Sequence, residues 1–237
     1  MPTIRVRIEK AVPFASESRI FPDSAISDTS PMPAPGLSSR LPEVSSEVLK
    51  LSANLQASVT DSDKFILVAG FHEGEPSEEI SVQLAAGLSA MDGQSVLLVD
   101  ANLRNPWLHD RFGIDLQPGL TNVLSASPAI TAGAVRVIKP NLAILPAGTA
   151  NAGASIFTST AFSQLMELEL YPRYRFVIVN SAPFGRFADA NLIASRADGV
   201  VITLTSGRHH RDELLDLKNE LESMRSKIVG TILCEES

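Results

Sequence analysis

The chain contains 237 residues, of which 44% are hydrophobic, and its formal net charge is −7. This length and apolar content support a sizeable core, whereas the acidic balance argues against a general function in nucleic-acid binding. One cysteine excludes an internal disulfide framework, and no apolar run reaches the roughly 18–20 residues that span a bilayer.

Residues 1–45 differ in composition from the rest of the chain. They carry seven of the fifteen prolines and many serines. A segment of this kind buries too little apolar surface to offset the entropy lost on ordering. We expect a disordered tail over residues 1–45 and a folded domain over residues 46–237. Within the tail, Thr3–Glu9 suggests either a frayed end or a short strand that docks on a partner's sheet.

Apolar segments alternate with helical ones after residue 45. Several of the apolar segments are almost continuous, as expected of parallel strands that are buried on both faces. The expected strands are Phe65–Val68, Ser95–Val99, Leu142–Leu145, Phe176–Val179, Val200–Leu204 and Ile228–Leu233. The expected helices are Val44–Ser58, Glu78–Met91, Thr158–Leu170, Ala188–Arg196 and Arg211–Met224. This alternation predicts an α/β fold with a doubly wound, mostly parallel sheet and helices on both faces.

The turns after the first, second and fourth expected strands are where such a sheet would bind a ligand. The first turn lies in the strand–loop–helix frame of a phosphate-binding loop. That loop needs a lysine for the phosphate oxygens, a hydroxyl for Mg²⁺ and free backbone N–H groups. Here Ser77 stands where the lysine is expected, Glu78 replaces the hydroxyl, and Pro76 lacks an N–H.

Read in order, the three strand ends resemble the cytoplasmic ATPase domain of bacterial tyrosine autokinases, which are P-loop proteins of the ParA/MinD type. In that family they read close to P-G-E-G-K-S-T, L-L-I-D-x-D-x-R-x-P and I-I-D-T-P-P. The corresponding segments here are Val68–Glu79, Val96–Pro106 and Phe176–Pro183. Lesser matches are Phe112–Gly113, Pro118–Leu124, Leu145–Gly148, Asp189–Ala190 and Ala197–Val200. The resemblance covers residues 44–234 and implies a P-loop-like domain.

The departures from the family pattern are at residues that bind nucleotide and magnesium rather than at residues that pack in the core. Pro76 stands at the second glycine of the loop, Ser77 at its lysine and Glu78 at its magnesium-binding serine. Asn102 and Asn180 each replace a family aspartate. We therefore expect a vestigial nucleotide site with no catalytic residue and no metal ligand. Its residues are Gly74, Glu75, Pro76, Ser77, Glu78, Asp100, Asn102, Arg104 and Asn180.

The free energies of the lost and added interactions favour the loss of nucleotide binding. One lysine–phosphate contact is worth about 1.5–3 kcal/mol. A glutamate roughly 4 Å from a phosphate adds about 1–4 kcal/mol of repulsion. Together with weaker Mg²⁺ binding, such terms approach the ~8 kcal/mol of a micromolar site. The prediction is a pseudo-ATPase without ATP or Mg²⁺ as cofactor, in which Arg104 pairs with Glu78 or Glu79.

Several other signals have plain structural interpretations. Asp100, just after a strand, is typical of a turn or cap residue. The pair His209–His210 suggests a metal site, but no cysteine or third histidine is near, so we expect solvated loop residues. Cys234 is expected to be a small late-strand side chain rather than a nucleophile. Trp107 and Phe112 flank a further expected helix and favour core packing over a partner-contact patch.

The resemblance implies a role in capsule or exopolysaccharide synthesis and export. The implied partner is the cytoplasmic part of an inner-membrane polysaccharide co-polymerase of the chain-length-determinant type, which places the protein in the cytoplasm, peripheral to the inner membrane. The family's kinases carry a C-terminal tyrosine cluster, whereas this sequence has only Tyr171 and Tyr174. The family also forms homo-oligomers, but the expected helix Val44–Ser58 lacks the arginines of its E-x-x-R-x-x-R motif.

Two alternatives to a non-catalytic regulator stay open at the level of sequence. The first is a divergent ATPase or tyrosine autokinase of the same pathway, which still binds nucleotide through backbone amides and Asp100. The second is a ParA/MinD-like adaptor outside polysaccharide synthesis.

Overall fold

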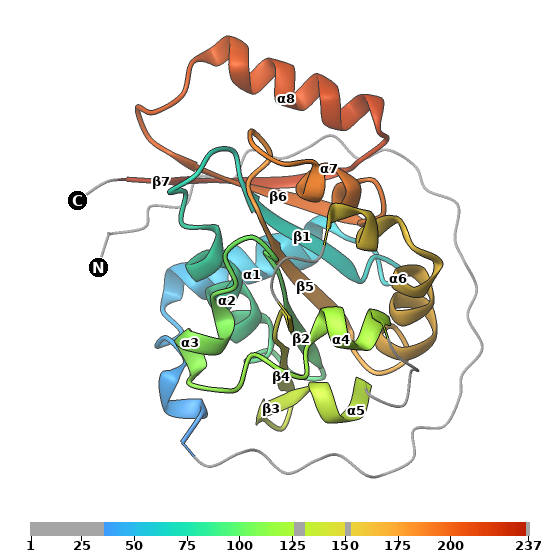
Figure 1. Ribbon diagram of the computed structural model, residues 1–237. Helices are drawn as coiled ribbons and strands as arrows, with labels where there is room; N and C mark the ends of the chain where they lie inside the picture. Colours follow the sequence, from blue (N-terminus) through green and yellow to red (C-terminus); the bar gives the residue numbers. More distant parts are fainter. Residues whose placement is uncertain (1–35, 126–130, 150–152, 236–237) are drawn as a thin grey trace.

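A single seven-stranded sheet organises the computed structural model, which describes residues 36–125, 131–149 and 153–235 (Figure 1). The strand order is β3-β4-β2-β5-β1-β6-β7. All neighbouring strands are parallel except β3 and β4. The strands are β1 Phe65–Gly70, β2 Val96–Ala101, β3 Arg136–Lys139, β4 Leu142–Leu145, β5 Phe176–Ser181, β6 Gly199–Thr205 and β7 Ile228–Cys234. The predicted α/β architecture is confirmed.

The six expected strands are all present, and five of them extend one or two residues beyond the predicted carboxyl end. The added residues include Asp100 and Asn180, whose backbones are paired across β2 and β5. Polar side chains end an apolar run without ending a strand, because strand pairing uses backbone groups. The strand β3 was not predicted. It is a short antiparallel edge in which only Ile138 is buried, so it has no continuous apolar run.

The helices cover both faces of the sheet (Figure 1). They are α1 Ser46–Ser58, α2 Ser77–Leu88, α3 Leu108–Phe112, α4 Leu120–Ser125, α5 Thr131–Ala134, α6 Thr160–Gln164, α7 Ala188–Ala194 and α8 Arg211–Ser223. The expected helix Thr158–Leu170 is interrupted. A 3-10 turn η3, Ala154–Thr158, precedes α6, and a π-helical segment η4, Leu165–Leu170, follows it. Ser159 is extended and caps α6 through its hydroxyl, so the chain restarts there.

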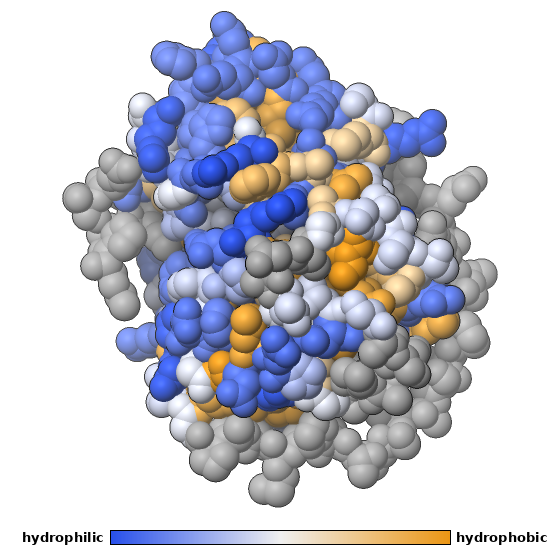
Figure 2. Space-filling model, viewed as in Figure 1, coloured by the Kyte–Doolittle hydropathy of each residue, from blue (hydrophilic) through white to orange (hydrophobic). Residues whose placement is uncertain are grey.

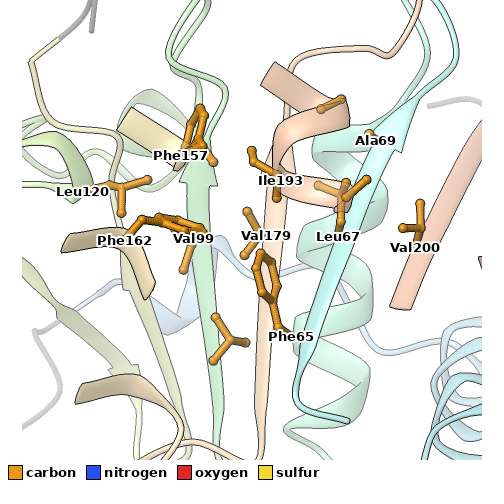
Figure 3. Packing of buried hydrophobic residues seen from close by; sticks show 14 of the residues in the cluster. Phe65, Leu67, Ala69, Val99, Leu120, Phe157, Phe162, Val179, Ile193 and Val200 are labelled. Atoms are coloured by element: carbon orange, nitrogen blue, oxygen red, sulfur yellow. The ribbon is translucent and has the colours of Figure 1, made fainter. Parts of the chain in front are cut away.

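The side chains of each central strand alternate between two cores. Phe65, Leu67 and Ala69 point toward the core that includes residues of α4, α6, α7 and α8. Figure 3 shows Phe65 close to Val179, with Phe157 and Phe162 on neighbouring elements of the same core. The alternate residues of β1 face α1, α2 and α3. Burial on both faces explains the nearly continuous apolar runs of the sequence.

The outer surface of α8 is hydrophilic in Figure 2, at the upper end of the molecule. Leu217 and Leu221 provide its buried side. No helix within the described ranges is both long and apolar enough to cross a membrane.

The segment 36–45, which the sequence assigned to the tail, contacts the domain through Leu37. This side chain is 9% exposed and packs in the same core as α1, next to the 3-10 helix η1, Ser38–Arg40. Helix α1 itself begins at Ser46 because the Ser45 hydroxyl accepts a hydrogen bond from the N–H of Val48. Residues 1–35, with the expected strand Thr3–Glu9, lie outside the described residues.

Candidate functional site

The carboxyl ends of β1, β2 and β5 surround one cavity of about 190 Å³. This volume is below the roughly 300–1,000 Å³ typical of ligand pockets. Six of the predicted site residues line it, namely Gly74, Glu75, Ser77, Glu78, Asn102 and Arg104. The other lining residues are His72, Glu73, Asn105, Ser181, Ala182, Pro183 and Phe187. Topology therefore brings the predicted strand ends together, although Pro76, Asp100 and Asn180 do not line the cavity.

The β1–α2 loop turns the side chain of Glu75 inward, where its side chain is 0% exposed. Gly74 has a φ of +83°, a conformation that favours glycine. A Cβ at Gly70 would lie 2.6 Å from the Cβ of Glu75, so that glycine provides space for the glutamate. The carboxylate accepts a hydrogen bond from the Thr205 hydroxyl at 2.6 Å and contacts Nε2 of His209 at 2.6 Å. Thr205 of β6 and His209 of the segment after β6 therefore hold the loop in place.

The first turn of α2 offers few donors to an anion. Pro76 has no N–H, and the N–H of Ser77 is donated to the carbonyl of Glu75 at 2.9 Å. Helix N-termini bind phosphate through free N–H groups, so two of the expected donors are missing or already used. The side chain of Glu78 lies on the cavity wall. Burial raises the pKa of Glu78, and the nearby carboxyl of Asp100 raises it further.

Asp100 makes the backbone hydrogen bonds expected of a turn and cap residue. One carboxylate oxygen accepts from the N–H groups of Trp107 at 2.8 Å and Leu108 at 3.0 Å. The other oxygen accepts from the N–H of Asn102 at 3.1 Å. Burial raises the pKa of Asp100, and these three bonds act in the opposite direction. The side chain holds the β2–α3 turn and fixes the start of α3.

Arg104 does not form the predicted pair with Glu78 or Glu79. Its guanidinium donates to Asp189 of α7 at 3.2 Å, and that carboxylate is 0% exposed. Glu79 instead lies 3.5 Å from Nε of Arg111. The prediction was wrong because the sequence does not show which carboxylate the fold brings to Arg104, and Asp189 lies 85 positions further along the chain.

Asn180 occupies the position of a family aspartate at the end of β5 and is completely buried. Its side-chain oxygen and nitrogen make no hydrogen bond with any described residue. Buried amides of this kind usually bind water or a ligand. Asn102, the other substituted aspartate, accepts a hydrogen bond from the N–H of Asn105 through Oδ1. The two asparagines therefore differ, because only one is engaged by the local backbone.

The expectation that His209 is a solvated loop residue is wrong. Its side chain is 4% exposed and contacts Glu75, as described above. The ring of His72, from the β1–α2 loop, lies 5.2 Å from the ring of His209 between centroids. A third histidine is therefore near, whereas His210 is exposed as predicted. His72 follows β1 and His209 follows β6, and these two strands are neighbours in the sheet. This shared position at the strand ends could have indicated that the two histidines lie close together.

Cys234 is a buried side chain at the end of β7, as the sequence predicted. Burial raises the pKa of its thiol to about 11, and the carboxylate of Glu75 adds to this effect. Since the thiolate is the nucleophilic form, the thiol is unreactive near neutral pH.

Comparisons with known proteins identify the homologues of this chain and the fold that it shares with them. No protein-family model matches the chain. It is 28% identical over 177 residues to tyrosine-protein kinase YwqD of Bacillus subtilis, which covers 75% of this chain and 74% of that protein. It is 29% identical over 184 residues to tyrosine-protein kinase CpsD of Streptococcus agalactiae, which covers 77% of this chain and 80% of that protein.

The solved structure of the VpsO kinase domain matches with a TM-score of 0.72 and 26% identity. The match covers 80% of this chain and 94% of that domain. The homologues of this chain are therefore bacterial tyrosine-protein kinases, and both the predicted family resemblance and the predicted P-loop-like fold are confirmed.

Proposed function

We propose that this protein is a non-catalytic relative of the bacterial tyrosine kinases, a pseudo-ATPase of capsule or exopolysaccharide synthesis. It acts by binding the cytoplasmic part of an inner-membrane polysaccharide co-polymerase. The observation that carries the proposal is the first turn of α2. There Ser77 and Glu78 line the cavity at the places where the family has its phosphate-binding lysine and magnesium-binding serine.

Charge and hydrogen bonding at this turn support weak nucleotide binding. Ser77 contributes no positive charge, and a charge-assisted contact to phosphate is worth about 1.5–3 kcal/mol. Glu78 adds a negative charge to the cavity wall, where a phosphate would meet repulsion of about 1–4 kcal/mol at roughly 4 Å. The raised pKa of Glu78 indicates that its own charge is already disfavoured there. A polyphosphate would disfavour that charge further.

The ligands for a magnesium ion are also few. Mg²⁺ requires oxygen ligands in nearly octahedral geometry. Both carboxylate oxygens of Asp100 accept backbone hydrogen bonds, which a bound ion would have to displace. Asn102 and Asn180 are neutral, so neither supplies the charge of the aspartate that it replaces. A pseudo-ATPase is the function that this set of groups supports best.

A regulator without hydrolysis must act through binding alone. Such a protein couples to its partner by binding two partner conformations with different affinities. The co-polymerase is proposed as that partner, and the cytoplasmic side of the inner membrane as the location, because the family resemblance implies both. Co-purification with the co-polymerase's cytoplasmic segments, compared with an unrelated membrane-protein tail, tests this part of the proposal.

The competing function is a divergent ATPase or tyrosine kinase, and one observation favours it. A Cβ placed at Gly74 would lie 3.4 Å from Nη1 of Arg208, so a guanidinium lies beside the altered loop. A second guanidinium, that of Arg104, belongs to a residue that lines the cavity at the strand ends. An arginine can bind phosphate in place of a lysine, and with two contacts rather than one.

Titration with nucleotide separates the two functions. Calorimetry and thermal shift with ATP and ADP, each with Mg²⁺, should detect no binding at millimolar nucleotide. Binding at micromolar nucleotide, or ATP hydrolysis that an Asp100→Asn substitution abolishes, would overturn the proposal. In that case, an Arg208→Ala variant would test whether this guanidinium replaces the missing lysine.

A further inference from the structure

Three side chains with metal-ligating atoms meet beside the β1–α2 loop, and none of them stands at the family's magnesium-binding position, Glu78. His72 comes from that loop, His209 from the segment after β6, and Glu213 from the first turn of α8. One potential ligand atom of each residue lies within 4.8 Å of those of the other two. The expectation that His209 and His210 bind no metal rested on the absence of a cysteine or a third histidine nearby, whereas the fold brings His72 next to His209.

His209 is oriented in the way that metal-binding histidines usually are. Its Nε2 lies 2.6 Å from the carboxylate of Glu75, and the side chain is 4% exposed. An ionised carboxylate only accepts hydrogen bonds, so this contact places the proton on Nε2 and leaves the lone pair on Nδ1. Nδ1 is buried and has no hydrogen-bond partner within the described part of the chain. Histidine ligands of metals commonly donate their other N–H to a carboxylate.

The carboxylate that orients His209 is itself fixed. Glu75 accepts a hydrogen bond from the Thr205 hydroxyl at 2.6 Å and is 0% exposed. Gly70 provides the space for its Cβ, as described above. The order Thr205, Glu75, His209 is therefore a preorganised support for one ligand nitrogen.

The other two side chains are positioned but can adjust. His72 stacks on the ring of Phe71, with centroids 4.1 Å apart. A Cβ at Gly185 would lie 2.6 Å from Nδ1 of His72, so the glycine makes room for this ring. One carboxylate oxygen of Glu213 accepts from the N–H of His210 at 3.1 Å, which leaves its second oxygen for another contact. Both His72 and Glu213 are exposed.

We propose that His72, His209 and Glu213 bind one zinc-type transition-metal ion, with Glu75 orienting His209 from behind. Two imidazole nitrogens and one carboxylate oxygen suit Zn²⁺, with solvent as the fourth ligand, rather than Mg²⁺ or Ca²⁺. Zinc ligands at 2.0–2.2 Å from the ion lie roughly 3.4 Å from one another. Small rotations of the two exposed side chains close the difference from the observed spacing. The ion would tie the β1–α2 loop to α8, whether or not the protein binds nucleotide.

Zinc binding by the untagged full-length chain tests the proposal. Calorimetry against a competing chelator should give one Zn²⁺ per chain, and Co²⁺ should give the absorption bands of a four-coordinate ion. His72→Ala and Glu213→Gln should each lower the affinity roughly 100-fold or more, because each removes or weakens a direct ligand. Glu75→Gln should lower it about 10–100-fold, as expected of an orienting partner. Circular dichroism verifies that each variant is folded.

Asp212→Asn is the matched control. It neutralises an exposed carboxylate in the same first turn of α8, next to Glu213 but outside the cluster, and should leave the zinc affinity unchanged. A wild-type chain that binds no Zn²⁺ at micromolar concentration overturns the proposal. So does a His72→Ala variant with wild-type affinity, or a loss of binding in Asp212→Asn, since either result would place the ion elsewhere.

Discussion

The β1–α2 loop and the β2–α3 turn line the same cavity, yet different contacts hold them in place. In the turn, Asp100 binds the backbone of residues two to eight positions further along the chain. In the loop, Glu75 is held by Thr205 and His209, more than a hundred positions away. Both acidic residues match the family's motifs. The comparison shows that a residue that matches a family motif can have a structural role, through local or through distant contacts.

The largest expected effect is the loss of the local contacts of Asp100. Asp100→Ala leaves three backbone N–H groups without their acceptor in a buried turn, and should lower the free energy of unfolding by about 3–5 kcal/mol. Asp100→Asn keeps one acceptor oxygen and should cost about 1–2 kcal/mol. Urea denaturation measures both variants. Equal and small losses in the two would show that the turn does not depend on this carboxylate.

A somewhat smaller effect is expected from the distant contacts of Glu75. Glu75→Ala removes the acceptor for Thr205 and the partner of His209, and should cost about 2–3 kcal/mol because both groups are buried. Glu73→Ala is the matched control. Glu73 lies in the same loop but is 58% exposed and pairs with the exposed Arg186, so its loss should cost at most about 1 kcal/mol. Similar denaturation midpoints for the two variants would contradict the inward role of Glu75.

Restoring the family's phosphate-binding residues in the β1–α2 loop tests whether these residues determine nucleotide affinity while the structural contacts stay unchanged. The combined change Pro76→Gly, Ser77→Lys and Glu78→Ser returns a donor, a cation and a hydroxyl while leaving Asp100 and Glu75 in place. One regained lysine–phosphate contact of about 1.5–3 kcal/mol corresponds to roughly 10–100-fold in ATP affinity. Calorimetry measures the gain relative to wild type. Ser77→Ala, which adds no charge, is the control and should leave ATP binding unchanged.

The sequence predicted contacts that run along the chain and missed those that run across the sheet. Asp100 could be recognised as a turn residue because its partners follow within eight positions. Arg104 and Asp189 are separated by 85 positions, and Glu75 and His209 by 134. These pairs depend on the strand order, which places β5 beside β2 for the first pair and β6 beside β1 for the second. Alternating apolar segments predict a parallel sheet, but they do not specify which strand ends are neighbours.

The smallest expected effect concerns Glu78, which stands at the family's magnesium-binding serine and lines the cavity. Burial and Asp100 raise its pKa above the ordinary value of 4.5. A raised pKa means that the folded protein holds this proton more tightly than the unfolded chain does. The associated stability is present below the ordinary value and is lost as pH rises through the raised pKa. At neutral pH the charged side chain therefore destabilises the fold.

Glu78→Gln should consequently raise the free energy of unfolding at pH 7, by less than about 1 kcal/mol because solvent reaches and screens this side chain. The advantage should disappear near pH 4, where wild-type Glu78 is mostly protonated. Urea midpoints of both proteins at the two pH values measure the difference. Glu79→Gln, which removes only the partly exposed pair with Arg111, is the control and should not stabilise the protein at pH 7. If Glu78→Gln were instead destabilising at pH 7, Glu78 would be held by favourable contacts, and the repulsion assigned to it in the nucleotide site would have to be withdrawn.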